Sequence, residues 1–67
     1  MAADPTARLA ELMLDVGRHR DAVREFSLAG YVTMVEQHKA KLSQVYDRIR
    51  EHCGEHDLEL PPGVPRR

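Results

Sequence analysis

Residues 27–31 read Ser-Leu-Ala-Gly-Tyr, and this stretch decides the fold because one helical pattern stops before it and another starts at its end. Apolar side chains recur every three or four positions from Leu9 to Phe26, and again from Tyr31 onward. Spacing of this kind places each set on one face of a helix. On one continuous helix, the step of five from Phe26 to Tyr31 would rotate the second set off that face. Gly30 also suits the left-handed conformation of a helix end, so the sequence predicts two helices joined by a turn.

The ends of both helices carry further signals. Asp4 can accept hydrogen bonds from free N–H groups of the first turn, and Pro5 has no N–H to leave unpaired there. Thr33 and Glu36 match a capping box, so a slightly later start of the second helix is an alternative. One long, kinked helix is the alternative to the hairpin itself. The expected bounds are about residues 5–28 for the first helix, 28–31 for the turn and 32–53 for the second helix, within a hairpin of residues 1–54.

The two apolar seams also match in register, which favours an antiparallel hairpin. Across a tight antiparallel turn, facing residues have numbers whose sum stays nearly constant. Five apolar pairs meet this condition: Phe26 with Tyr31, Val23 with Val35, Val16 with Leu42, Leu12 with Val45, and Leu9 with Ile49.

Other apolar side chains, namely Met13, Leu14, Met34 and Tyr46, lie off the two seams. They suit a second hairpin that docks to complete a four-helix bundle, so we expect an all-α homodimer. In architecture such a hairpin is similar to the plasmid copy-number regulators of the Rop family. The similarity is one of shape without a shared motif, and a fold alone does not carry function.

Length and cysteine content limit how this chain can be stabilised. A core built from 67 residues rarely supplies more than a few kcal/mol. The single cysteine, Cys53, cannot form an intrachain disulfide. We therefore expect a metal ion or a second chain to supply the stability that the small core lacks.

Charge and hydropathy narrow the classes of partner. Ten lysine and arginine residues against eleven aspartate and glutamate residues leave a net charge of −1, which argues against DNA binding. No signal peptide is recognisable, and no stretch approaches the roughly 18 apolar residues of a membrane span. A single free thiol fits a reducing compartment. We expect a soluble, cytoplasmic protein with no membrane partner.

The chain changes character in its last part, residues 55–67, where polar and apolar side chains first alternate and proline then prevents a helix. This pattern predicts an extended or disordered, proline-rich tail. Its end, Pro62–Arg67, fits the Pro-x-x-Pro-x-basic form that aromatic grooves bind as a polyproline helix. The alternative is that Leu58, Leu60 and Val64 dock on a partner or on the other protomer.

Two pairs of histidines are candidate metal ligands. The register places His19 opposite His38 inside the apolar seam, and His52 and His56 share one helical face. In a dimer the first pair could bring four imidazoles together, enough for a zinc site or for axial haem ligation. The alternatives are a polar layer that fixes register, a pH-sensitive interface, and, for the second pair, cations that complement a helix C-terminus. Cys53 points about 100° away from His52 and does not share its face.

Part of the second helix resembles a known motif. Residues 43–47 are similar to the Ser-Gln-Glu-Leu-Asp motif of the small helical-hairpin phosphatases of sporulation phosphorelays. Ser43, Gln44 and Asp47 match, whereas Val45 and Tyr46 depart from it. The resemblance covers five residues, and it implies Asp47 as the functional position.

Arg18, Arg20 and Arg24 form a basic patch on the first helix, which suits contact with RNA. The alternative is a solvated face that neighbouring acidic residues balance. A helix-turn-helix reader of DNA is not indicated, because Phe26 stands where a small residue is expected and Glu36 where an apolar one is expected.

Nothing in the sequence indicates an enzyme, since it contains no glycine-rich phosphate loop and no nucleophile with a matching base. The leading hypothesis is a small non-catalytic regulatory or inhibitory protein without a cofactor, which binds another protein as a homodimeric helical hairpin. A metal-binding bundle, with zinc or haem, and an RNA-binding hairpin are the alternatives. The expected partner contacts are Arg18, Arg20, Arg24, Tyr46, Leu58, Leu60, Val64, Arg66 and Arg67.

Overall fold

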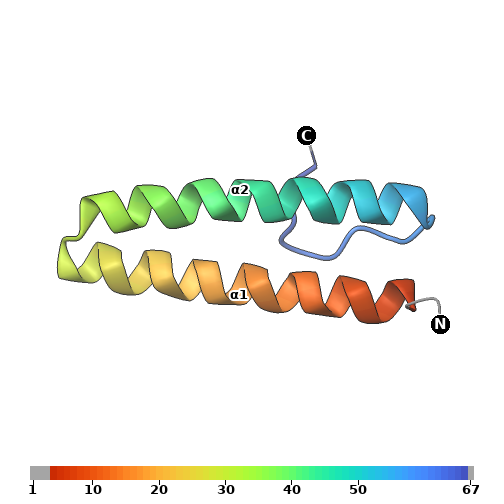
Figure 1. The fold of residues 1–67 in the computed structure, drawn as a ribbon, viewed down its shortest axis with the longest axis horizontal. Coiled ribbons are helices and arrows are strands. Elements are labelled where there is room, and N and C mark those ends of the chain that lie inside the picture. The colour runs from red at the N-terminus through yellow and green to blue at the C-terminus, as the bar shows by residue number, and fades with distance from the viewer. Residues whose placement is uncertain (1–3, 67) are drawn as a thin grey trace.

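The predicted all-helical hairpin is confirmed in the computed structural model, which describes residues 4–66. Helix α1 (Pro5–Ala29) and helix α2 (Val32–Glu55) lie antiparallel along their whole length (Figure 1). One continuous kinked helix is thereby excluded. Helix α2 begins before Thr33 and has no side-chain cap, so the capping-box start is wrong. It also runs two residues beyond the expected end at residue 53.

Both ends of α1 follow from local chemistry. The Asp4 carboxylate accepts a hydrogen bond from the Thr6 N–H at 3.0 Å, and Pro5 occupies the first helical position. At the other end Gly30 has a φ of 82°, and the Tyr31 N–H donates to the Phe26 carbonyl at 2.9 Å. This six-to-one bond is typical of a Schellman motif, which needs a residue in the left-handed conformation. Gly30 therefore stops α1 and reverses the chain.

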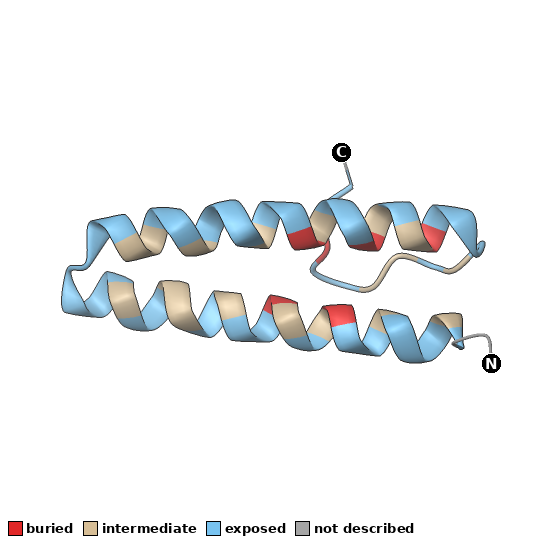
Figure 2. Ribbon diagram, viewed as in Figure 1, coloured by how far each residue is buried: buried red, intermediate tan, exposed pale blue. Residues whose placement is uncertain are grey.

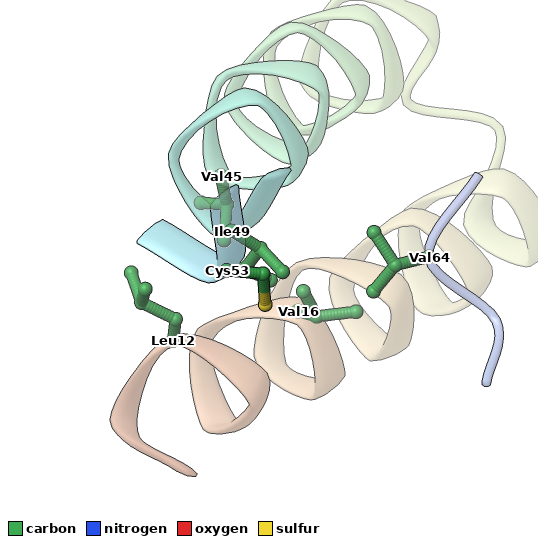
Figure 3. Close-up of a cluster of buried hydrophobic side chains, with 6 residues drawn as sticks. All are labelled: Leu12, Val16, Val45, Ile49, Cys53 and Val64. Carbon is green, nitrogen blue, oxygen red and sulfur yellow. The ribbon is translucent and has the colours of Figure 1, made fainter. Parts of the chain in front are cut away.

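The buried core lies in the half of the hairpin away from the turn (Figure 2). Its members come from both helices and from the tail, and Figure 3 shows their side chains meeting: Leu12, Val16, Val45, Ile49, Cys53 and Val64. Ile49 is fully buried at the centre of the group. From Gly17 to Gln44, a stretch that the structure describes in full, no side chain is buried.

The segment after α2 returns along the hairpin instead of leaving it (Figure 1). Val64 is 6% exposed, and Leu58 and Leu60 are half-buried against the core. Arg50 of α2 donates from Nη1 to the Pro65 carbonyl at 2.9 Å. The tail therefore forms a third layer over one half of the hairpin.

A turn within the tail redirects the chain toward the core. The Val64 N–H donates to the Pro61 carbonyl at 3.3 Å, and Gly63 has a φ of 87°. Proline followed by glycine at the two central positions is the pattern of a type II turn. A positive φ is incompatible with a polyproline helix, so Pro62–Arg66 does not take the conformation that aromatic grooves bind. Arg67 lies outside the described residues.

Candidate functional site

The turn end of the hairpin exposes large apolar side chains. Leu28 is 82% exposed, Val32 71% and Tyr31 60%. Leu28 is two positions beyond Phe26, which on a helix turns it about 200° away from the seam and into solvent. We call the surface around the turn the tip surface; it surrounds a shallow pocket lined by Phe26, Ser27, Gly30, Tyr31, Val32 and Val35.

The tip surface carries no charge. Residues 26–35 contain no Asp, Glu, Lys or Arg, although 31% of the whole chain is charged. Exposed helix positions in a small soluble protein are ordinarily rich in charge. Sequence reasoning missed this surface because it treated the stretch only as a turn, but the uncharged run was a visible signal.

In the half of the hairpin next to the tip, the apolar seam between the helices is incompletely buried. Its seam residues Val23, Val35 and Leu42 are only half-buried, whereas Val64 of the tail covers the opposite half. Two helices packed alone bury one face each, and the turn of the tail at Gly63 lies beside the Arg20 side chain of α1. Within residues 4–66, no third layer covers the tip half.

His19 and His38 meet within this half. Their Nδ1 atoms are 3.1 Å apart, and their ring centroids are 5.3 Å apart. Phe26 stacks on the His38 ring at 5.6 Å with an interplanar angle of 17°. Both histidines are half-buried. The two rings therefore face each other across the two helices, as the register predicted.

His52 and His56 lie at the other end of the molecule. Their ring centroids are 4.6 Å apart, and the Nε2 of His52 is 2.8 Å from the Pro5 carbonyl. That contact makes Nε2 a hydrogen-bond donor and joins the end of α2 to the start of α1. Helix α2 ends at Glu55, and His56 is its C-cap residue. Cys53 faces the core, away from this pair.

Among residues 4–66, no three His, Cys, Asp or Glu side chains are arranged to hold one metal ion. Each histidine pair therefore stands without a third ligand from the same chain in the described part.

The three arginines expected to form a patch on α1 are divided between faces. Arg20 and Arg24, at i, i+4 spacing, line one shallow hollow together with Gly17 and Asp21. Arg18 lies about 200° around the helix from Arg20 and pairs with Asp15 at 3.6 Å. On one face of α1, RNA would therefore meet only Arg20 and Arg24, with Asp21 beside them.

The remaining predicted contacts differ in their accessibility. Tyr46 is half-buried against the core and Arg66 is exposed. Val64 is buried within this chain, so it is not free to dock elsewhere while the tail stays in place. Asp47, the position implied by the phosphatase-like motif, forms an ion pair with Arg50 on the same helix.

Comparison with protein-family models, with curated proteins and with solved structures finds no significant match. Neither helix, over the described residues, is both long and apolar enough to cross a membrane. The function has to be inferred from the chemistry of the residues themselves.

Proposed function

We propose that this chain is a non-catalytic regulatory protein that acts by protein–protein binding, and that its tip surface joins two copies into a homodimer. The observation that carries the proposal is the exposed, uncharged apolar tip beside a half of the hairpin that has no buried residue. Covering both features with a second hairpin would complete a four-helix arrangement, the usual way in which such hairpins close their core.

A second copy is the occupant that the charge pattern favours. In a two-fold dimer the same patch meets itself, so residues near the axis face their own copies. A charged patch would then bring like charges together, whereas residues 26–35 carry none. A typical interface of about 800 Å² per partner is a modest part of the chain's 5204 Å² surface.

The non-catalytic part of the proposal is motivated by the open shape of the hollows beside Cys53 and Arg20. The hollow beside Cys53 and the hollow beside Arg20 and Arg24 are both open to solvent, whereas enzymes generally need a concave site that excludes water. A regulator of this kind acts by occupying a surface on its target.

The first experiment measures the mass of the native protein in solution as a function of concentration. We expect a dimer, and we expect Leu28→Lys with Val32→Lys to weaken it by at least about a hundredfold, because facing like charges cost several kcal/mol. Ala7→Lys with Ala10→Lys is the matched control, since both residues are exposed and lie at the end of α1 away from the tip. A monomeric native protein, or equal effects of the two changes, would contradict the dimer.

A second experiment tests the surface in cells. A photo-crosslinking amino acid replaces Val32 in one variant and the exposed Ala10, near the other end of α1, in the control. A Val32-dependent adduct of twice the chain mass supports the homodimer. An adduct with a different protein would overturn the homodimer while keeping protein binding, and no adduct at position 32 would overturn the tip surface as an interface.

A further inference from the structure

The spacing of the two Nδ1 atoms of His19 and His38 matches that of two ligands on one metal ion. They are 3.1 Å apart. Zinc–imidazole bonds are about 2.0–2.1 Å long, so two ligand nitrogens separated by 90–110° at the metal lie about 2.9–3.4 Å from each other. The two rings come from different helices, so an ion bound between them would cross-link α1 and α2.

The two rings are held in position before any ion arrives. Phe26 stacks on the His38 ring at 5.6 Å, and both histidines are half-buried in the seam between the helices. Ligands whose orientation is fixed by packing lose little freedom when they bind. By contrast, the Nε2 of His52 already donates to the Pro5 carbonyl, so the His52–His56 pair is less suited to bind a metal ion.

An ion bound by His19 and His38 would also stabilise the fold, because of where the two residues lie in the hairpin. It lies within the stretch from Gly17 to Gln44, where no side chain is buried. Small domains with too little core often add a disulfide or a metal, and the only cysteine of this chain is buried elsewhere. A cross-link between α1 and α2 would stabilise the half of the hairpin that packing stabilises least.

We propose that His19 and His38 form a two-histidine site for a transition-metal ion of the zinc, nickel and copper(II) class, which prefers imidazole nitrogen. In the metal-free pair, one Nδ1 carries the hydrogen that lies between the rings and the other accepts it. Binding requires that hydrogen to move to Nε2 of its own ring. Both rings stay neutral, and both Nδ1 lone pairs face the ion. Water completes the coordination. This site does not depend on the proposed dimer.

The test is calorimetric titration of the full chain with Zn²⁺, with Mg²⁺ as the control ion because hard cations prefer oxygen. We expect one Zn²⁺ per chain and a raised thermal midpoint, and no binding of Mg²⁺. Replacing His19 and His38 by Leu should abolish the binding, since both ligands are removed. His52→Gln with His56→Gln is the matched control, and this variant should bind Zn²⁺ like the native chain.

Several outcomes would overturn the site. These are no binding by the native chain, equal binding by the His19→Leu and His38→Leu double variant, or loss of binding in the His52 and His56 control. Should the leucine variant fail to fold by circular dichroism, His38→Gln, which keeps a polar side chain of similar size, takes its place under the same criteria. The Leu28→Lys, Val32→Lys chain should still bind Zn²⁺, which separates this site from the dimer.

Discussion

Val64 offers the sharpest test of how the tail docks, because its side chain is 6% exposed and packs into a core made by both helices. Val64→Ala removes two buried methyl groups, each worth about 0.8 kcal/mol of transfer free energy. The docked tail should therefore lose about 1.6 kcal/mol relative to the detached tail. The loss cannot exceed the free energy of docking, because the tail can detach while α1 and α2 stay packed.

The reactivity of the Cys53 thiol reports how often the tail detaches from the hairpin. Its thiol is buried beneath the tail, with Sγ 3.9 Å from the Glu59 carbonyl. A thiol reagent such as DTNB reaches it only when the tail opens. Where opening and closing are faster than modification, the rate follows the population of the open form. Since 1.4 kcal/mol is a factor of ten, Val64→Ala should raise the rate of Cys53 modification about 15-fold.

Val32→Ala is the matched control, because it makes the same chemical change at a side chain that is 71% exposed. Val32 belongs to the proposed dimer surface but lies at the end of the hairpin away from the tail, so the effect of Val32→Ala on the rate of Cys53 modification should stay within about twofold. Circular dichroism checks that both variants keep their helices. Equal rates for Val64→Ala and the native chain, or equal increases in both variants, would refute the docking of the tail over Cys53.

Three further predictions concern the stability of the hairpin. Ile49→Ala should lower the free energy of unfolding, measured in urea, by about 2–5 kcal/mol, because Ile49 is fully buried. A loss below about 1 kcal/mol would show that the core is not centred on Ile49. Gly30→Ala should cost about 1–2 kcal/mol in the same assay, because its φ of 82° is left-handed, and an unchanged midpoint would contradict the Schellman turn. Gly17→Ala should raise the free energy of unfolding by about 1 kcal/mol, and with it the thermal midpoint, because Gly17 lies inside α1 and a Cβ there would meet no atom within 4 Å. A lower midpoint would indicate that another chain packs against Gly17.

Part of the candidate site was already readable in the sequence. The pairing of His19 with His38 followed from the register, because a short turn leaves antiparallel helices little freedom to slide. The separation of Arg18 from Arg20 follows from 100° per residue, although the sequence reasoning grouped them by proximity along the chain. The tip surface was visible as the uncharged run of residues 26–35. Its exposure, however, depends on what packs around the turn.

The sequence by itself determined the two helices, the local signals at the ends of α1 and the antiparallel pairing of the helices. These features depend on interactions within a few residues: the cap at Asp4, the left-handed Gly30 and the three-or-four spacing of apolar side chains. Only the tertiary structure decided where the tail lies. The hydrophobic effect is non-directional, so Leu58 and Val64 were equally suited to a partner, a second copy or their own hairpin. The groove that α1 and α2 form together, and the turn at Gly63 that aims Val64 into it, selected the last of these.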